Sequence, residues 1–336
     1  METLNRSLIA ILSLAMAVSS CGRGGKGSDG EATDVSELIR TLDTEDLLIG
    51  KSANIYVFGD RVYIVDNRSD DSILYVFDAK SGSYLGSALK PGPSPYEITE
   101  PGALGVDAAT GAAILFDYGQ NRIVTFNVDS VLSDSTQGIR TLRKLDMSGF
   151  PDSYVYVNDS TGFGRLIVPD GRHSFSQSVC RYDATTGEIR KFTTSDAVGD
   201  CNRSSVAVSP DGNTVVEACR TQDLIVIYDA EGHPVREIKG DDYVPDADLS
   251  MSFFSGVAVT DRHILTAYSG KKKNEGFYGD QIMVFDLDGN HVKTLKTGME
   301  IRKMAYSPAT DNLYLSTLDS IQFGIIPLGN IEGMSR

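Results

Sequence analysis

The chain contains no tryptophan, and it has only four histidines and four cysteines among 336 residues. Without tryptophan, the sialidase-type Asp box and the tryptophan docking repeat of quinoproteins are excluded as they are usually written. No G-x-S-x-G elbow is present, and no base accompanies the serine-rich stretches. The cysteines form no CxxC pair and no cluster with histidine, which argues against a zinc site. We therefore identify no catalytic residue from the sequence.

Positive charge is also scarce. Lysine and arginine total 31 against 46 aspartates and glutamates, which gives a formal net charge of −15. No basic stripe offsets this balance, so we expect no nucleic-acid partner. The length permits one large domain or two small ones. A hydrophobic content of 41% is enough to build a core.

Long apolar runs are missing as well. Leu8–Val18 carries no charge but spans only eleven residues, whereas a transmembrane helix needs about 20. This length suits the apolar region of a secretory signal, with Arg6 supplying a positive flank. Ser19 and Ser20 then precede Cys21. No later apolar run exceeds the length of a strand, so we expect no second membrane segment.

The sequence V-S-S-C, ending at Cys21, resembles the lipobox of bacterial lipoproteins. The resemblance implies that a signal peptide, residues 1–20, is removed and that Cys21 carries a lipid. An ordinary signal peptide followed by an incidental cysteine is the alternative. Gly22, in place of aspartate, is similar to lipoproteins sorted to the outer membrane of Gram-negative cells. We therefore expect a cell-envelope protein anchored in the outer membrane, on its periplasmic or its surface side.

The segment Gly22–Asp34 is rich in glycine and polar residues and is not expected to fold by itself. Residues 21–35 would form a flexible tether with a reach of roughly 20 Å. Such a tether would hold a folded domain, residues 36–336, clear of a lipid surface.

Three cysteines follow Cys21 in the chain, namely Cys180, Cys201 and Cys219. An odd number in an oxidising compartment allows one disulfide and one free thiol. Each cysteine lies in or near a predicted strand, so buried free thiols are an equal alternative. The sequence does not decide the pairing.

One phrase recurs along the chain: an apolar run, an aromatic residue, aspartate, a turn with glycine, and an alternating strand. Each copy is typical of a β-hairpin, because aspartate and glycine supply the hydrogen bond and the positive φ that tight turns need. The copies are ILYVFDAKSGSYLGSAL from Ile73, a degenerate RIVTFNVDSV from Arg122, SVCRYDATTGEIRKF from Ser178, LIVIYDAEGHPVREI from Leu224, IMVFDLDGNHVKTL from Ile282 and a weaker FGIIPLGN from Phe323.

A second hairpin lies between these copies, most clearly in SVAVSPDGNTVVEAC from Ser205. Two hairpins per roughly 50 residues make a four-stranded unit, and such units build a β-propeller. The count closes at six, with the last unit lacking its outer strand. We expect the segment Ser36–Leu48 to supply that strand and close the ring. The predicted fold is thus all-β, a six-bladed propeller of four-stranded antiparallel blades, with no helical periodicity to compete.

The pattern resembles the TolB-like six-bladed propellers that occur as lipoproteins in Bacteroidetes. Besides the lipobox and the repeats, the stretch ALKPGPSPYEIT is similar to a G-x-G-P-x-E-aromatic motif found after the first blade of these proteins. Gly92, Pro93 and Glu97 keep part of that motif, whereas Tyr96 precedes the glutamate and Ile98 replaces the aromatic residue. The resemblance covers nearly all of residues 36–330 and is specific for the fold rather than for an activity.

Ligands of propellers usually bind at the top face, where the loops between strands 2 and 3 and between blades meet. His173 is the one histidine predicted there, since the other three follow turns at the bottom. The long loops 90–102, 240–254 and 269–280 are further candidates. The candidate binding residues are Tyr96, Glu97, Tyr118, Asn121, Arg172, His173, Asp241, Asp242, Tyr243, Phe277 and Tyr278.

Loop 240–254 gathers carboxylates that suit calcium, a cation that prefers oxygen ligands. The weak metal candidates are Asp241, Asp242, Asp246 and Asp248, and a solvated acidic loop is the alternative. No other cofactor is expected.

The predicted function is a lipid-anchored, monomeric binding module that presents its top-face loops to an envelope protein, a peptide or a glycan. One alternative is a calcium-dependent lactonase-like hydrolase, a class that six-bladed propellers also host. Another is a purely structural part of a larger envelope complex. Fold similarity alone does not decide between them.

Overall fold

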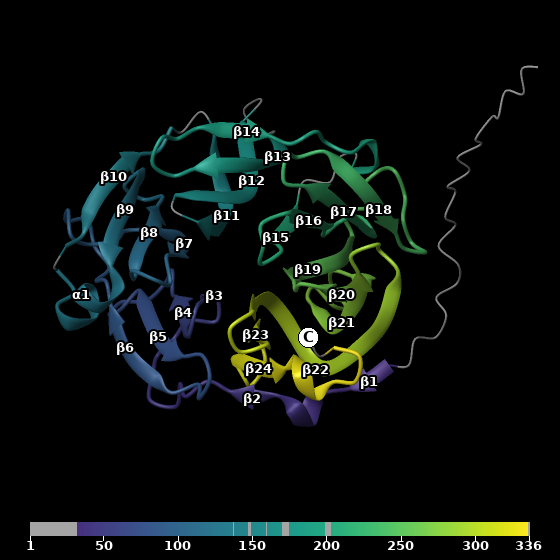
Figure 1. Cartoon of the computed structure of the whole chain (residues 1–336), viewed down its shortest axis with the longest axis horizontal. Coiled ribbons are helices and arrows are strands. Elements are labelled where there is room, and N and C mark those ends of the chain that lie inside the picture. Colours follow the sequence, from purple (N-terminus) through teal and green to yellow (C-terminus); the bar gives the residue numbers. More distant parts are fainter. Residues whose placement is uncertain are drawn as a thin grey trace, which may run out of the picture.

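The protein forms a ring of β-sheets around a central opening (Figure 1). The computed structural model describes residues 32–334, except 137, 147–148, 159, 170–174 and 199–202. Its strands make four separate four-stranded antiparallel sheets and one eight-stranded sheet. The predicted all-β class with four-stranded antiparallel blades is confirmed.

The four separate sheets are blades 1 to 4, and in each of them consecutive strands of the chain pair with one another. From the channel outward, blade 1 is β3 (Asn54–Phe58), β4 (Arg61–Val65), β5 (Leu74–Asp78) and β6 (Tyr84–Ala88). Blade 2 is β7 (Pro101–Val106), β8 (Ala112–Asp117), β9 (Arg122–Asn127) and β10 (Arg140–Lys144). Blade 3 is β11 (Phe150–Asn158), β12 (Thr161–Pro169), β13 (Phe175–Asp183) and β14 (Ile189–Lys191). Blade 4 is β15 (Ser204–Val208), β16 (Thr214–Cys219), β17 (Leu224–Asp229) and β18 (Pro234–Lys239).

The eight-stranded sheet consists of blades 5 and 6, which are joined through one long strand. The first part of β22 (His291–Ser307) pairs with β21, and the part from Ile301 onward pairs with β23. The same strand is therefore the outer edge of blade 5 and the inner edge of blade 6. The other strands are β19 (Met251–Val259), β20 (His263–Lys272) and β21 (Gly279–Asp286) in blade 5, and β23 (Asn312–Thr317) and β24 (Phe323–Pro327) in blade 6.

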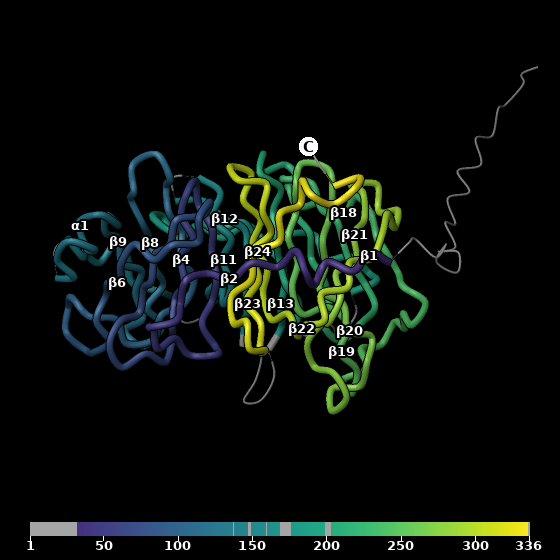
Figure 2. The backbone as a smooth tube through the Cα atoms, turned by 90° about the horizontal axis from the view of Figure 1, so that it is seen from below, coloured from purple at the N-terminus to yellow at the C-terminus, as the bar shows by residue number. Residues whose placement is uncertain are grey.

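The N-terminal segment crosses the outside of blades 5 and 6 (Figure 2). Within the predicted closing segment, only the two residues of β2 (Arg40–Thr41) pair with β24, and they are antiparallel to it. The rest of that segment includes the 3-10 helix η1 (Ser36–Leu38). In addition, β1 (Ala32–Asp34) pairs in parallel with β22, as a fifth strand on blade 5 that the sequence did not predict.

One short helix departs from the expectation of an all-strand chain. The degenerate repeat from Arg122 forms β9 and then turns into α1 (Val128–Ser133). Asn127 caps this helix, since its side-chain oxygen accepts a hydrogen bond of 3.1 Å from the amide of Ser130. Val128 and Val131 are buried, which fixes the helix against the blade. Two further 3-10 turns are η2 (Asp196–Val198) and η3 (Leu328–Asn330).

The recurring aspartate and glycine shape the turns as predicted. The Asp78 carboxylate accepts hydrogen bonds from the amides of Lys80 and Ser81, at 3.1 and 2.6 Å. Gly82 closes the same turn at φ 78°, a conformation that a residue with a Cβ adopts only with strain. Equivalent aspartates accept amide hydrogen bonds in the turns that follow β13, β17 and β21.

The core consists of apolar clusters between neighbouring blades. The cluster that joins blade 6 to blade 1 packs Tyr314 and Ile325 against Ile64 and Phe77, all of them buried. The Tyr314 hydroxyl also donates a hydrogen bond of 2.5 Å to the carbonyl of Ala79 in blade 1. The packing of these side chains buries apolar surface where blade 6 meets blade 1, and it therefore stabilises the closed ring.

No helix among the described residues is long and apolar enough to cross a membrane.

Candidate functional site

The inner strands of all six blades surround a central channel with a volume of about 1120 Å³. This exceeds the roughly 300–1,000 Å³ of typical small-molecule sites. The inner strands run from the top face downward, and the second strands return to the top. Residues at the start of an inner strand, or just after a second strand, therefore lie together at the upper end of the channel. We call the following lining residues the channel mouth: Asn54, Glu100, Tyr118, Asp152, Arg165, Arg203, Arg220, Phe277, Tyr278, Arg302 and Lys303.

The channel mouth concentrates positive charge in an acidic protein. Among the residues of the channel mouth there are five cations (Arg165, Arg203, Arg220, Arg302 and Lys303) and two carboxylates, those of Glu100 and Asp152. The chain as a whole has a formal net charge of −15. A cleft lined by one sign of charge raises the local concentration of ligands of the opposite sign. The mouth therefore favours an anion.

Arg165 is paired with a carboxylate of the mouth. Its Nε donates a hydrogen bond of 2.8 Å to Oδ1 of Asp152, and its Nη2 donates to Oδ2 of the same carboxylate. Its Nη1 donates to the carbonyl of Ser204 at 2.7 Å. This two-pronged ion pair links blade 3 to blade 4 and leaves the charge of Arg165 largely compensated.

Arg302 lies on β22, and its partners among the described residues are neutral groups. Its Nη2 donates to the carbonyls of Ser52, at 2.8 Å, and Ala53, which precede the inner strand of blade 1. Its buried Nε has no hydrogen-bond partner among the residues that the structure describes. Among the described residues Arg302 makes no ion pair. The guanidinium is thus held in place while its charge stays uncompensated.

Arg220 lies against two aromatic rings of the loop before β21. Its guanidinium carbon is 4.8 Å from the ring centre of Phe277 and 5.5 Å from that of Tyr278. Its buried Nη1 has no hydrogen-bond partner within the described part of the chain. Burial and the charges of nearby arginines lower the pKa of Arg220. Cation–π contact therefore positions this arginine without neutralising it.

Lys303 completes the group of uncompensated cations. Burial lowers the pKa of its ammonium to about 8, and the neighbouring charges of Arg302 and Arg165 act in the same direction. The described residues include no ion-pair partner for it. A desolvated ammonium beside like charges is unfavourable unless an anion joins it.

A buried carboxyl group supports the mouth from within blade 4. Glu217 is 3% exposed, and burial raises its pKa. It accepts hydrogen bonds from the hydroxyl groups of Ser204, at 2.7 Å, and Tyr228, at 2.9 Å. Ser204 in turn supplies the carbonyl that holds Arg165. Glu217 thus acts on the mouth through Ser204, by fixing the start of the inner strand.

Three of the residues predicted from the sequence line the channel. Phe277 and Tyr278 stack on Arg220 as described above. Tyr118 also lines the mouth, and its hydroxyl donates a hydrogen bond of 2.8 Å to the carbonyl of Pro151. The prediction that top-face loops would supply these side chains rested on the strand order of a propeller.

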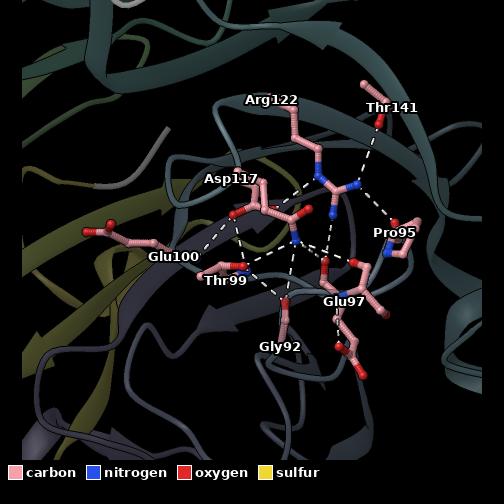
Figure 3. A network of polar contacts seen from close by, with 10 residues as sticks. Gly92, Pro95, Glu97, Thr99, Glu100, Asp117, Arg122 and Thr141 are labelled. Carbon is pink, nitrogen blue, oxygen red and sulfur yellow. Dashed lines mark hydrogen bonds and ion pairs between the residues drawn. The ribbon is translucent and has the colours of Figure 1, made fainter.

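The loop that holds Tyr96 and Glu97 is tied into the fold by Arg122 (Figure 3). The Arg122 guanidinium bonds to the Asp117 carboxylate, at 3.2 Å, and to the carbonyls of Pro95 and Glu97, at 2.9 and 2.6 Å. The side-chain amide of Gln120 donates a further hydrogen bond of 3.2 Å to the Glu97 carbonyl. Neither Tyr96 nor Glu97 lines the channel.

The acidic loop also lies outside the channel lining. Asp241 and Asp242 are exposed and neighbour Asp223, whose pKa burial raises to about 6. Asp246 is exposed, and Asp248 accepts a hydrogen bond of 2.8 Å from the amide of Ser250. Among the described residues, no three histidine, cysteine, aspartate or glutamate side chains are grouped so that they hold a metal.

Tyr243 and Asn121 have local contacts. The Tyr243 hydroxyl donates a hydrogen bond of 3.1 Å to the carbonyl of Ala197. The centre of its ring lies 5.0 Å from the Lys239 ammonium. Asn121 adopts φ 51° in the turn between β8 and β9. Neither residue lines the channel.

Some predicted residues lie outside the described part of the chain. These are Cys21, Arg172, His173 and Cys201. Cys180 and Cys219 are both buried, and Cys180 is a free thiol whose pKa burial raises to about 12.

The sequence analysis missed the cations of the channel mouth. A signal for them exists, because charged residues interrupt apolar strands at matching positions of the repeats. Arg302 and Lys303 open the inner strand of blade 6, and Arg220 directly follows the second strand of blade 4. An inner strand without function is expected to begin with neutral residues.

Comparisons with known proteins support the fold. Residues 27–161 match a family described as a 6-bladed β-propeller. A sequence search among curated proteins gives no significant match.

Solved structures with the same fold include three that differ widely in description. Regucalcin from Agrobacterium tumefaciens, a calcium-binding protein, is 14% identical over 85% of this chain and 92% of its own, with a TM-score of 0.55. A luciferin-regenerating enzyme is 11% identical over 87% of this chain and 95% of its own, with a TM-score of 0.58. A member of the DUF4221 family from Bacteroides vulgatus is 13% identical over 86% and 94%, with a TM-score of 0.53. At these identities the likeness concerns the fold alone.

Proposed function

We propose that the protein is a binding module that takes an anionic ligand at its channel mouth. The observation that carries this proposal is the group formed by Arg220, Arg302 and Lys303. These three cations line one cavity, and none of them has an ion-pair partner among the described residues. Uncompensated like charges destabilise a fold, so a purely structural role does not account for them.

The buried nitrogens of the mouth point to the same ligand chemistry. Within the described residues, Nη1 of Arg220 and Nε of Arg302 are donors without an acceptor. A buried donor without a partner costs about 1–3 kcal/mol. A carboxylate, phosphate or sulfate group supplies acceptor oxygens and negative charge together. It would accept hydrogen bonds from these donors and compensate the positive charge of the mouth.

We propose that this module lies in the cell envelope, on the basis of the lipobox-like sequence that ends at Cys21. In the proposed setting Cys21 carries the lipid anchor, and the protein is a monomeric outer-membrane lipoprotein of the TolB-like type. The tether is shorter than the predicted residues 21–35, because β1 (Ala32–Asp34) pairs with β22 and Val35 is buried. The similarity to a Bacteroides propeller is consistent with this setting. An anionic peptide, glycan or small molecule would then reach the top face from the surrounding compartment.

The predicted alternative, a calcium-dependent lactonase-like hydrolase, requires oxygen ligands that converge on a divalent cation. The mouth instead gathers cations, which repel calcium. Its two carboxylates are Asp152, which is paired with Arg165, and Glu100, which is exposed. We therefore favour binding over hydrolysis.

Calorimetric titration with citrate at low ionic strength tests the proposal, because citrate carries three carboxylates and no apolar body. We expect citrate to bind the protein, and Lys303→Met to weaken binding about tenfold, since charged hydrogen bonds contribute about 1.5–3 kcal/mol. Lys90→Met is the matched control, because Lys90 pairs with Asp71 outside the channel lining. Absence of citrate binding, or equal losses in both variants, would contradict the proposal.

A further inference from the structure

The channel below the mouth differs from the mouth in character. Residues later in each inner strand lie deeper, and there most of the lining is aliphatic or aromatic, with a few polar side chains such as Asn158 and Ser209. Asp107, at the far end, is the one charged group among the described lining residues below the mouth. We call the following apolar residues the lower channel: Tyr56, Val57, Phe58, Val155, Tyr156, Val157, Val206, Val208, Val257, Val259, Met304 and Ala305.

Aromatic rings form one wall of the lower channel. Phe58 lies 6.5 Å from Tyr56 in a stacked arrangement and 5.7 Å from Tyr156 edge to face, measured between ring centres. Gly105 makes this wall feasible, because a Cβ there would come within 2.6 Å of the Tyr156 ring. Rings from blades 1 and 3 thus meet across the small residues of blade 2.

The lower channel is half-buried on the side of blades 1, 3 and 4, whereas Val257, Val259 and Met304 are buried. Val57, Val155 and Val206 each keep part of their surface accessible from the channel. Water is a poor occupant of an apolar cavity, because it finds few hydrogen-bond partners there. An apolar ligand segment would cover the surface and displace that water.

The cationic mouth and the mostly apolar lower channel follow one another along the channel axis. An amphiphile has its anionic head group and its apolar chain in the same order. We infer that the ligand is a single-chain, long-chain carboxylate whose head group lies at Arg302 and Lys303. Its alkyl chain extends into the lower channel against the Phe58 wall. This inference rests on the proposed function and adds the chemical class of the ligand. A guanidinium favours the carboxylate head, since it matches two carboxylate oxygens. The ring of blades encloses a single column of space, which favours one chain.

A series of alkyl carboxylates of increasing length tests the inference. Hexanoate, octanoate, decanoate and dodecanoate are titrated into the protein by calorimetry, each well below its micelle concentration. We expect affinity to rise about threefold per added methylene group until the lower channel is filled. Decanol, which lacks the charge, is expected to bind at least about tenfold more weakly than decanoate.

A variant of the lower channel sharpens the test. Val155 is half-buried on β11 and faces the channel. Val155→Asn is expected to weaken dodecanoate at least about fivefold, because burying an amide without partners is unfavourable. The same change should leave citrate binding unaltered. Val155→Ile, the matched apolar variant, should keep dodecanoate affinity within about twofold of the unchanged protein.

The outcomes separate the two proposals. Citrate binding together with carboxylate affinities that do not depend on chain length would overturn the amphiphile inference and leave the anion site intact. If decanol bound as tightly as decanoate, the carboxylate head group would contribute nothing to affinity, and the inference would be overturned. Failure of both citrate and dodecanoate to bind would overturn both proposals.

Discussion

Two arginine sites in this protein have opposite hydrogen-bonding states. Arg122, between β8 and the loop 90–102, has partners at all three guanidinium nitrogens, and its side chain is 8% exposed (Figure 3). Arg302 at the channel mouth has carbonyl partners at Nη2 but a buried Nε without one. Arg122 faces a fully buried carboxylate, whereas Arg302 has no carboxylate within ion-pair distance among the described residues.

The contrast teaches how a structural arginine differs from one that serves a ligand. The partners of Arg122 all come from the fold, so its contribution is complete without a ligand. At the channel mouth, some hydrogen-bond donors and positive charges have no partner among the described residues, which lowers the stability of the fold. Substitutions should therefore act in opposite directions at the two sites.

The largest expected effect is at the structural site. Arg122→Met should lower the free energy of unfolding by about 3–5 kcal/mol, because it leaves the buried Asp117 carboxylate uncompensated. Chemical denaturation measures this change. The double variant Arg122→Met with Asp117→Asn should recover part of the loss, since no charge is then left buried. Equal stability of the single variant and the unchanged protein would show that the two arginine sites do not differ as described.

At the channel mouth, a substitution is expected to raise the free energy of unfolding. The folded-state pKa of Lys303 is lowered to about 8, so its charged form destabilises the fold at neutral pH. This contribution disappears as the pH rises from about 8 to about 10.5, where the folded state loses its proton first. Lys303→Met should therefore raise stability at pH 7 by up to about 3 kcal/mol while it weakens citrate binding. A Lys303→Met protein less stable than the unchanged one would contradict the description of the mouth.

A third variant sharpens the comparison with a carboxyl group on the top face. Burial raises the folded-state pKa of Asp223 to about 6, and the charges of Asp242 and Asp241 add to the effect. The folded state thus keeps the proton longer, and stability falls as the pH rises from about 4 to about 6. Asp223→Asn should remove this fall and raise stability at pH 7 by up to about 3 kcal/mol. Thermal melts from pH 4 to pH 7 measure it, and parallel curves for the two proteins would count against the expectation.

The smallest expected effect is a pH dependence of ligand binding. A bound anion raises the pKa of Lys303, so binding takes up a proton near pH 8. Citrate affinity should then fall about three- to tenfold between pH 7 and pH 10. Calorimetry in buffers of different ionisation enthalpy measures the proton uptake. In Lys303→Met the pH dependence should vanish, and its persistence there would assign the titration to another group.

Much of the fold follows from local sequence patterns. Alternating strands with aspartate and glycine turns predict blades because hairpin chemistry is local, as the turn at Asp78 and Gly82 shows. The two-residue length of β2 and the parallel pairing of β1 were not predictable, since both depend on how the outer edges of distant strands lie.

The candidate site was predictable only in part. Phe277 and Tyr278 were found because strand order alone places their loop on the top face. Arg220 and Lys303 were missed, because their direction toward the axis is set by the closed ring rather than by neighbouring residues. Tyr96 lies on a loop whose backbone is tied down by Arg122, a contact that spans 27 residues and leaves no local pattern.

A crystal structure of the protein with citrate would test the anion site most directly. We expect citrate in the channel mouth, with carboxylate oxygens within hydrogen-bond distance of Arg302 and Lys303 and with Nη1 of Arg220 satisfied. An empty mouth at saturating citrate, or citrate bound only outside the channel, would contradict the assignment of these cations to a ligand.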